Sequence, residues 1–298
     1  MASQTRIGVV TVTFNSGAVL RPFLDCVFKQ TYPDFLLFAV DNASTDTTIQ
    51  MLQECTDERL RIIPNPDNRG VAEGNNQGIR AAMVDGCASI LLLNNDTEFS
   101  DDLFSLLHQA AEDFHCDMTT GKVLYFEPPG RIWCAGGWLE KSRFFAAFHH
   151  GMDKEDIGQF EQPRRVTYAP TCCLMVRRSA FERIGLMDSK YFVYSDDVDF
   201  LYRCLVADLS LWYIPGATVL HKVSALTGGD TSEFAIRFMT RNRAYFLRKH
   251  LSRWKVVLWS LHFMGYTLPL RLLRRQDSFH ICRLRFDSMI EGLRMRYE

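Results

Sequence analysis

The N-terminal half of the chain repeats one pattern four times: a short apolar run, then a polar turn, then a segment with helical spacing. The apolar runs are residues 7–14, 35–40, 61–64 and 89–93. Such runs, bounded by turn residues, predict buried strands. Strands that alternate with helices predict an α/β fold, with a mostly parallel sheet covered by helices on both faces. Ligands of such sheets bind beyond the carboxyl ends of the strands.

The length and composition indicate an ordinary globular protein. The chain has 298 residues, of which 47% are hydrophobic and 23% are charged, enough apolar material for a large core. These values exclude disorder, collagen and a coiled coil. The nine cysteines include no C-x-x-C pair, which argues against a zinc ribbon or a thioredoxin-type site. The first residues lack the apolar segment of a signal peptide, so we expect a cytoplasmic location.

The net charge of −1 conceals a strongly basic C-terminal segment. From Phe234 to Glu298 there are fourteen Lys and Arg but only four Asp and Glu, whereas the rest of the chain is acidic. A basic segment of this kind suggests contact with phosphate groups or with an anionic membrane. We therefore expect two domains, residues 1–232 and a helical extension of residues 233–298.

Part of this extension is apolar. Its uncharged stretch, Val256 to Leu270, is shorter than the about 20 residues that a membrane span needs. Basic residues flank it, and Trp254, Trp259 and Tyr266 are side chains that settle at a headgroup boundary. The pattern predicts peripheral binding to an anionic membrane, on the inner face of the cytoplasmic membrane. The alternative is a helical pair packed on the first domain or on a second copy, a homodimer. No nucleic-acid partner is expected.

Several common motifs are absent from the sequence. No G-x-G-x-x-G follows the first strand and no G-x-x-x-x-G-K-[ST] occurs, which argues against a standard dinucleotide site and a P-loop. G-x-S-x-G and H-E-x-x-H are also missing, which argues against the hydrolases that carry them.

Polar side chains follow three of the four predicted strands. Asn15, Asp41 and the run Asn94-Asn95-Asp96 should therefore gather at one edge of the sheet. A buried carboxylate such as Asp41 needs a partner, and it could accept a hydrogen bond from the N–H group of a pyrimidine base. Asp96, together with diphosphate oxygens and water, suits Mg²⁺ or Mn²⁺. The plain alternatives are helix capping after the second strand and a simple turn after the fourth.

Three further features carry polar residues that could belong to a site. Residues 68–78 combine small residues with amides before a helix, which suits a ribose or phosphate but is also typical of turns. Residues 194–200 hold three Asp among apolar neighbours, and such acids raise one another's pKa, as in a general base or a metal site. The alternative is a solvated helix N-terminus. His221 ends a predicted strand. A lone His is more often structural than a ligand, but the carboxylate of Asp96 and the acidic cluster upstream strengthen the case for a ligand role.

Six segments in this order resemble the family 2 inverting glycosyltransferases of the GT-A fold, over roughly residues 5–225. They are residues 9–15, 40–46, 68–78, 91–97, 194–200 and His221. The Asn-Asn-Asp run, Ala-Gly-Gly at 135–137 and Arg-Asn at 241–242 are similar to the rhamnosyltransferase-like branch of polysaccharide assembly. The resemblance implies a Rossmann-like α/β domain with a mostly parallel central sheet, followed by a C-terminal helical extension.

The resemblance also implies roles for individual residues. It places the nucleotide-sugar at the strand ends and the 68–78 segment: Thr11, Asn15, Asp41, Asn68, Gly70, Asn76, Asn94, Asn95 and Asp96. It implies metal ligands at Asp96 and His221 and a catalytic general base at Asp197. For the acceptor we expect contacts from the loop-rich middle of the chain: Trp133, Gly136 and Thr171.

Two positions depart from the family pattern. Asn94 replaces the first Asp of the D-x-D metal motif, so the site offers one charge fewer. Asp196 replaces the usual Glu before the catalytic Asp, which leaves open whether Asp196 or Asp197 is the base.

The function implied is transfer of a sugar, rhamnose in the similar branch, from a nucleoside diphosphate sugar to a hydroxyl of a glycan or lipid-linked glycan. Mg²⁺ or Mn²⁺ would neutralise the leaving diphosphate, and an Asp would take the acceptor proton with inversion of the anomeric centre. One alternative is a sugar nucleotidyltransferase, although the first strand lacks the Gly-rich phosphate loop that such enzymes need. The other is a non-catalytic nucleotide-sugar-binding partner at the membrane.

Overall fold

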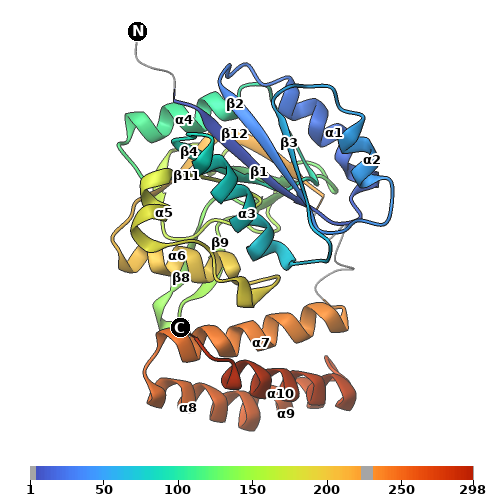
Figure 1. Cartoon of the computed structure of the whole chain (residues 1–298). Coiled ribbons are helices and arrows are strands. Elements are labelled where there is room, and N and C mark those ends of the chain that lie inside the picture. The colour runs from blue at the N-terminus through green and yellow to red at the C-terminus, as the bar shows by residue number, and fades with distance from the viewer. Residues whose placement is uncertain (1–4, 223–230, 298) are drawn as a thin grey trace. The chain divides into compact units, whose positions relative to one another are not determined.

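The computed structural model of the protein describes residues 5–222 and 231–297 (Figure 1). Contacts within the chain divide it into two compact units. The first comprises Met1–Phe192 and Asp196–Leu226, and the second comprises Val193–Ser195 and Thr227–Glu298.

The first unit is built on one large mixed sheet. Its main path has the strand order β10-β12-β6-β11-β4-β1-β2-β3. β1 (Ile7–Thr13), β2 (Phe35–Asp41), β3 (Leu60–Pro64) and β4 (Ser89–Leu93) are mutually parallel where they pair, as predicted. β11 (Cys173–Arg177) runs antiparallel to β4 and to β6 (Met118–Tyr125), and β6 is parallel to β12 (Leu211–His221).

Short strands complete the sheet and add a separate ribbon. β5 (Thr97–Phe99) pairs with β12, β7 (Ile132–Cys134) with β6, and β10 (Arg164–Val166) with β12. β8 (Gly137–Glu140) and β9 (Ala146–His149) form a two-stranded antiparallel sheet. The predicted strand that ends at His221 is part of β12, which has a bulge between Ile214 and Thr218.

Helices cover both faces of the sheet. They are α1 (Gly17–Phe28), α2 (Thr48–Gln53), α3 (Gly70–Val84), α4 (Leu103–Asp113), α5 (Arg178–Ile184) and α6 (Asp196–Val206), with short 3₁₀ turns at Lys141–Arg143 and Ser189–Tyr191. Side chains alternate between the faces along each strand. Val9 packs with α1 and α4, whereas the next residue, Val10, packs with α3, α5 and α6. Figure 1 shows α3 lying across β1 on that second face.

Glycine makes the contact between α3 and β1 close. A Cβ atom on Gly74 would lie 2.8 Å from the methyl groups of Val12, and one on Gly78 would collide with Val10. The small residues of the 68–78 segment are therefore used partly for helix–strand packing rather than for approach to a ligand.

The second unit is helical. It contains α7 (Glu233–His250), α8 (Arg253–His262), a π-helical turn η3 (Phe263–Thr267), α9 (Leu268–Leu273) and α10 (Phe279–Arg294). α7 and α10 approach so closely that a Cβ atom on Gly292 would collide with the carbonyl of Arg241. The side-chain amide of Asn242 donates hydrogen bonds to the carbonyls of Val193 at 2.7 Å and of the next residue at 2.8 Å. These bonds join the short 193–195 segment to α7.

One helix among the described residues, Arg253–Leu273, is long and apolar enough to cross a membrane by length and composition alone. It consists of α8, η3 and α9 in succession and has 21 residues.

Candidate active site

Strand pairing brings Asp96 and His221 together. Asp96 lies between β4 and β5, and β5 pairs with β12 so that Thr97 is opposite His221. The backbone N–H of Lys222 donates to the carbonyl of Asp96 at 2.9 Å. As a result, Oδ1 of Asp96 and Nε2 of His221 are 3.2 Å apart, and both side chains are buried. The structure therefore joins the two predicted metal ligands.

The geometry of this pair fits a cation. The two facing atoms are not aligned for a hydrogen bond, and Oδ1 of Asp96 and Nδ1 of His221 have no hydrogen-bond partner among the described residues. A carboxylate and an imidazole are suitable ligands for Mn²⁺, and the carboxylate also suits Mg²⁺. Residues 5–222 and 231–297 contain no cluster of three or more His, Cys, Asp or Glu that could hold a metal. A cation here would take its other ligands from substrate oxygens and water.

Asp41 and Asn15 organise the loop between β2 and α2. The carboxylate of Asp41 accepts hydrogen bonds from the hydroxyl of Thr13 at 2.9 Å and from the N–H and hydroxyl of Ser44 at 3.0 and 2.6 Å. Asn15, at a positive φ of 52°, accepts from the N–H of Thr45 at 2.8 Å. Asp41 is thus buried but fully partnered, and both residues hold the loop beside the end of β1.

Asn68, Gly70 and Asn76 fix the start of α3. Asn68 accepts from the N–H of Gly70 at 2.9 Å, and Gly70 has a positive φ of 80°. Its missing Cβ leaves room for Phe192, whose ring carbon would be only 2.6 Å away. Asn76 exchanges two hydrogen bonds with the backbone of Met187, at 2.8 and 2.9 Å. These residues connect α3 to the segment that leads into the acidic cluster, and both ends of the Asn76 amide are already used.

Five predicted site residues carry a buried polar atom with no hydrogen-bond partner in the described part of the chain. They are Thr11, Asn95, Asp96, Asp196 and His221. Native proteins rarely bury polar atoms without partners, and such atoms commonly bind water, an ion or a ligand. Asn95 is held in place by its other amide atom, which donates to the carbonyl of Val12 at 2.6 Å. Asn94, by contrast, contributes backbone bonds to Cys172 and Thr97.

The three acids of the cluster have different surroundings. Asp199 is fully buried and accepts hydrogen bonds from the hydroxyl of Tyr191 at 3.1 Å and from Arg203 at 2.9 Å, so it is structural. Asp197 accepts from the hydroxyl of Tyr168 at 2.5 Å and from the N–H of Val198 at 2.7 Å. Asp196, the first residue of α6, is buried with one carboxylate oxygen unpartnered.

Burial sets the proton affinities of the two remaining acids. Loss of water, with the charge of Asp197 added, raises the pKa of Asp196 to about 7. Burial also raises the pKa of Asp197, but hydrogen bonds from Tyr168 and Val198 to its carboxylate oppose the rise. Of the pair, Asp197 is therefore the member that ionises more readily, while Asp196 retains its proton to higher pH.

A row of rings connects the acidic cluster with the Asp96–His221 pair. The ring of Trp133 meets the rings of His221 and His149 edge-on, each at 4.8 Å between centroids. His149 in turn stacks on Tyr168 at 5.5 Å, and Tyr168 binds Asp197. Burial lowers the pKa of His149, which favours its neutral form. The motifs of the sequence did not indicate His149 or Tyr168; of this row, only Trp133 and His221 were predicted.

The structure gives little support for a substrate contact at the other two predicted acceptor residues, Gly136 and Thr171. Gly136 has a positive φ of 70°, and a Cβ there would lie 2.9 Å from Val166, so its role is packing. Thr171 is half-buried in the turn before β11.

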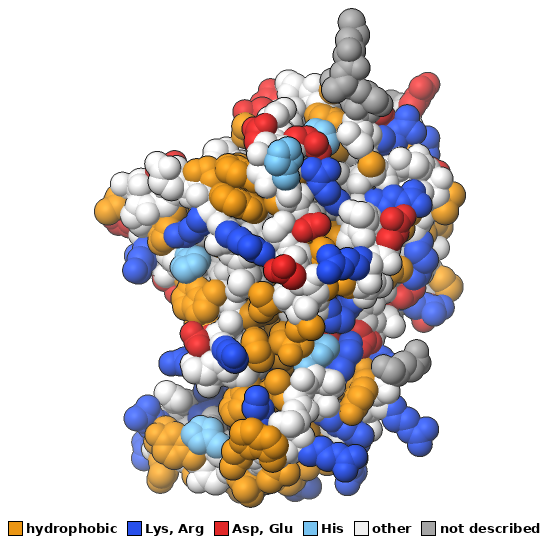
Figure 2. All heavy atoms as spheres, turned by 90° about the vertical axis from the view of Figure 1, so that its left-hand side faces the viewer, with side chains coloured by type: hydrophobic (Ala, Val, Ile, Leu, Met, Phe, Trp, Pro, Cys, Tyr) orange, Lys and Arg blue, Asp and Glu red, His pale blue; other side chains and the backbone are white. Residues whose placement is uncertain are grey.

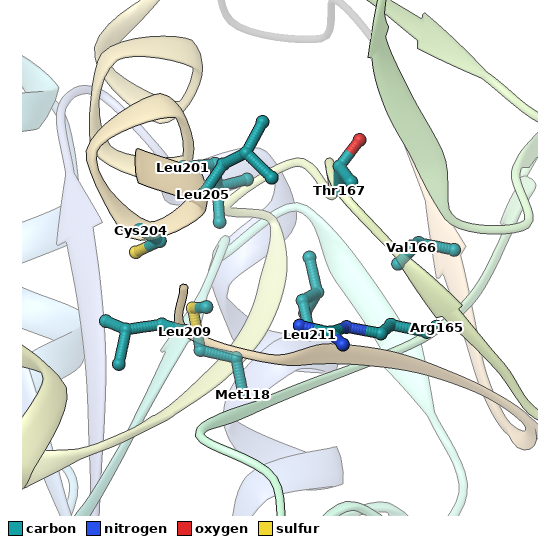
Figure 3. Close-up of a pocket in the computed structure, with 9 residues that line it drawn as sticks. All are labelled: Met118, Arg165, Val166, Thr167, Leu201, Cys204, Leu205, Leu209 and Leu211. Atoms are coloured by element: carbon teal, nitrogen blue, oxygen red, sulfur yellow. The ribbon is translucent and has the colours of Figure 1, made fainter. Parts of the chain in front are cut away.

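A small cavity lies elsewhere in the first unit, between α6 and strands β6, β10 and β12. Its volume is about 20 Å³, enough for about one water molecule, and most of its lining is apolar (Figure 3). None of the predicted site residues lines it. It is therefore a packing defect rather than a substrate site.

Comparisons with known proteins identify the family of the chain. The profile of the family described as "Glycosyl transferase family 2" matches residues 8–185. The chain is 26% identical, over 95% of its length and 97% of the relative's, to an N-acetylglucosaminyl-diphospho-decaprenol L-rhamnosyltransferase of Mycobacterium tuberculosis. It is 22% identical to the dTDP-rhamnosyl transferase RfbF of Shigella flexneri, over 74% of this chain and 70% of that one.

Solved structures share the fold. GalNAc-T7 with UDP, GalNAc and Mn²⁺ superposes with a TM-score of 0.69 at 15% identity, covering 97% of this chain and 55% of that one. The mannosyltransferase PcManGT of Pyrobaculum calidifontis, in complex with GDP-Man and Mn²⁺, superposes with a TM-score of 0.59 at 13% identity, covering 98% and 88%. The predicted α/β fold with a C-terminal helical part is thereby confirmed.

Proposed function

The chain belongs to glycosyl transferase family 2, and from this premise we propose that it transfers rhamnose from a nucleoside diphosphate sugar to a hydroxyl of a lipid-linked glycan. That it is a glycosyltransferase follows from the family match and from relatives that carry this activity in their names. The choice of rhamnose and of a lipid-linked acceptor rests on two relatives, one named as acting on a diphospho-decaprenol and one as a dTDP-rhamnosyl transferase.

One observation carries the proposed site. Thr11, Asn95, Asp96, Asp196 and His221 each keep a buried polar atom unpartnered in the described chain. Thr11 lies within β1, Asn95 and Asp96 follow β4, His221 ends β12, and Asp196 begins α6. Leaving such an atom unpaired costs about 1–3 kcal/mol, so five of them together favour a polar ligand that binds there. A nucleoside diphosphate sugar supplies the hydroxyl and phosphate groups that these atoms need.

We assign the metal to the Asp96–His221 pair. When bound there, Mg²⁺ or Mn²⁺ would neutralise the charge that develops on the leaving diphosphate. Asp96 and His221 would hold the cation through Oδ1 and Nε2, two facing atoms that make no hydrogen bond to each other. Asn94 stands where the family has a second acid, so the protein contributes only one negative charge, and diphosphate oxygens must supply the rest.

We assign the general base to Asp197. A base must be ionised and held in one orientation, and Tyr168 and Val198 do both by donating to its two oxygens. Its raised pKa makes it a stronger base than an exposed carboxylate. The acceptor hydroxyl gives its proton to Asp197 as its oxygen attacks the anomeric carbon, and the bond to the diphosphate breaks on the opposite side. This single in-line displacement inverts the anomeric centre.

The remaining assignments follow from this arrangement. Asn15, Asp41, Asn68 and Gly70 shape the nucleotide side, while Asn76 acts through its bonds to Met187 rather than by touching substrate. Trp133 and His149 form the wall on the acceptor side. We assign residues 1–232 to the catalytic domain and residues 233–298 to a helical extension.

Product analysis of the full-length protein tests the proposal. The protein is incubated with dTDP-rhamnose, N-acetylglucosaminyl-diphospho-polyprenol and Mn²⁺ or Mg²⁺, and with other nucleoside diphosphate sugars in parallel. We expect free dTDP and a rhamnosylated lipid that form only when acceptor and metal are both present. Release of pyrophosphate would instead indicate a nucleotidyltransferase. Binding of the donor without turnover, measured as thermal stabilisation of roughly 2.7 kcal/mol at about 100 times Kd, would indicate a binding protein.

A further inference from the structure

The helix Arg253–Leu273 leaves its apolar side chains uncovered. Trp254, Leu258 and Leu261 are 60%, 52% and 59% exposed, and they follow one another at helical spacing of four and three residues. The large apolar residues Val257, Met264, Tyr266, Leu272 and Leu273 are exposed as well. Only 6% of the apolar window of this helix is buried. A stripe of this size on a soluble protein normally marks a binding surface.

The helix is nevertheless fixed within the C-terminal unit. Leu268 is buried, and its carbonyl faces the buried thiol of Cys282 on α10. Arg271 binds the carboxylate of Asp277 at 3.0 Å, and Arg285 binds it at 2.8 Å. These two guanidinium groups lower the pKa of Asp277 to about 2, so the contact persists at any ordinary pH. The C-terminal end of the helix is thus anchored, while the stripe from Trp254 onward remains available.

The charge around the stripe has one sign. No Asp or Glu occurs from Phe234 to Gln276, a stretch that contains ten Lys and Arg. Arg253 and Lys255 stand at the start of the helix, and Arg271, Arg274 and Arg275 stand at its end. Figure 2 shows hydrophobic and basic side chains side by side on the C-terminal helices. An apolar stripe with basic ends fits a surface that is apolar inside and anionic outside.

The length of the uncharged part of the helix bears on whether the helix crosses a membrane or lies on it. The uncharged part, Val256 to Leu270, would extend about 22 Å as a helix, short of the roughly 30 Å of a hydrocarbon core. Trp254, Trp259 and Tyr266 are residues that prefer the headgroup region. The whole helix of 21 residues is long enough to cross a membrane, but its uncharged part is not. Together with these aromatic residues, that favours a helix lying in the plane of the interface.

We propose that the exposed face of the helix Arg253–Leu273 docks on an anionic lipid membrane as a peripheral anchor. A second copy of the chain is a poorer occupant, because a two-fold symmetric contact through this face would bring the same basic residues of both copies together. Anionic lipid headgroups complement them instead. Membrane docking is independent of the transfer reaction and is measured without it.

Vesicle co-sedimentation of the full-length protein tests the proposal. We expect binding to vesicles of phosphatidylglycerol and phosphatidylcholine at low salt, weaker binding at 1 M salt, and little binding to pure phosphatidylcholine. Sodium carbonate at high pH should release the bound protein. Protein that stays in the membrane after carbonate would show that the helix spans the bilayer and would overturn the proposal.

Matched variants identify the surface. Trp254→Gln/Leu258→Gln/Leu261→Gln should abolish vesicle binding, whereas Val84→Gln/Ile157→Gln, which changes two exposed apolar residues of the first unit, should not. Arg274→Gln/Arg275→Gln should weaken binding on the order of fivefold for each charge removed, unlike Arg21→Gln/Arg183→Gln. Circular dichroism and the thermal midpoint show whether each variant is folded.

Two further results would also overturn the proposal. One is wild-type protein that ignores anionic vesicles at low salt. The other is binding that survives the triple Gln variant in folded protein. A concentration-dependent dimer in light scattering, lost in the triple variant and not accompanied by vesicle binding, would assign the face to a second copy instead.

Discussion

The hydroxyl of Tyr168 donates a hydrogen bond of 2.5 Å to Oδ2 of Asp197. Tyr168 is buried, and its own pKa is raised well above the usual value, so it remains a donor at every relevant pH. Because it stabilises the charged form of the carboxylate, it keeps Asp197 ionised beside a neighbour, Asp196, that keeps its proton. This difference between the two carboxyl groups supports the proposal that Asp197, rather than Asp196, is the base.

Tyr168→Phe should reduce turnover and move its pH dependence. Removing the donor raises the pKa of Asp197, so the acid limb of the pH profile of kcat/KM should shift to higher pH. Turnover at neutral pH should fall roughly tenfold, because the carboxylate of Asp197 is no longer held in one orientation. Tyr213→Phe is the control, because it also loses a buried phenol hydrogen bond, to the carbonyl of Phe160, but lies outside the site. An unshifted acid limb in Tyr168→Phe would show that Asp197 is not the group that titrates.

Asp197→Asn should abolish transfer while donor binding persists. Loss of a general base typically costs about 10² to 10⁴ in rate, and the amide retains the shape of the carboxyl. Single-turnover kinetics and donor titration measure the two properties separately. Asp196→Asn should remain active. An inactive Asp196→Asn with an active Asp197→Asn would exchange the two roles.

Asp196 should make folding stability fall as pH rises. The unfolded chain loses this proton near 3.8, whereas the folded protein holds it to about pH 7, so stability decreases between those values. Asp196→Asn should therefore raise the thermal midpoint above that of the wild type at pH 8 but not at pH 4, by about 2–4 °C per kcal/mol. Asp199→Asn, which loses bonds to Tyr191 and Arg203, should lower it at pH 8. Equal midpoints for wild type and Asp196→Asn at pH 8 would argue against a proton on Asp196.

Three of the four strands predicted in the N-terminal half can be recognised from their own apolar residues, which are buried. β1, β2 and β4 are almost continuous runs of buried residues, and the predicted bounds differ from the observed ones by one residue at most. β6 is buried too, but the sequence did not predict it, because its Thr and Lys residues interrupt the apolar pattern. Thr119 and Thr120 donate to the carbonyls of Leu107 and Cys173, and Lys122 binds Asp156 at 2.9 Å. Partners so distant in the sequence cannot be inferred from local pattern.

The same distinction applies to the site. The edge that holds Asn95 and Asp96 was predictable because polar residues directly follow buried strands. The row from His221 through Trp133 and His149 to Tyr168 was not, because it depends on how β7, β9 and β12 come together. The sequence also did not predict that the side-chain amide of Asn76 forms hydrogen bonds with the backbone of Met187. A sequence does not show whether an amide already has a partner in the fold.

Asp96→Ala and His221→Ala should each weaken metal-dependent donor binding. Both remove one of two facing ligands, so we expect at least tenfold lower affinity for Mn²⁺ in the presence of dTDP, measured by electron paramagnetic resonance of free Mn²⁺. EDTA should abolish transfer by the wild type, and added Mn²⁺ or Mg²⁺ should restore it. His108→Ala, a half-buried histidine on α4, is the control and should bind Mn²⁺ normally. Full activity in excess EDTA would refute the metal assignment.

Gly78→Ala should destabilise the protein without touching the site. An added Cβ would collide with a methyl group of Val10, and both Gly78 and Val10 are buried, so the cost should be about 1–3 kcal/mol from overpacking. Gly216→Ala is the matched control, because a Cβ there meets nothing within 4 Å. Urea unfolding followed by circular dichroism measures both variants, and donor affinity should be unchanged in the folded fraction of Gly78→Ala. If Gly78→Ala is as stable as the wild type but loses donor affinity, the small residues of the 68–78 segment serve the nucleotide rather than the packing of α3 on the sheet.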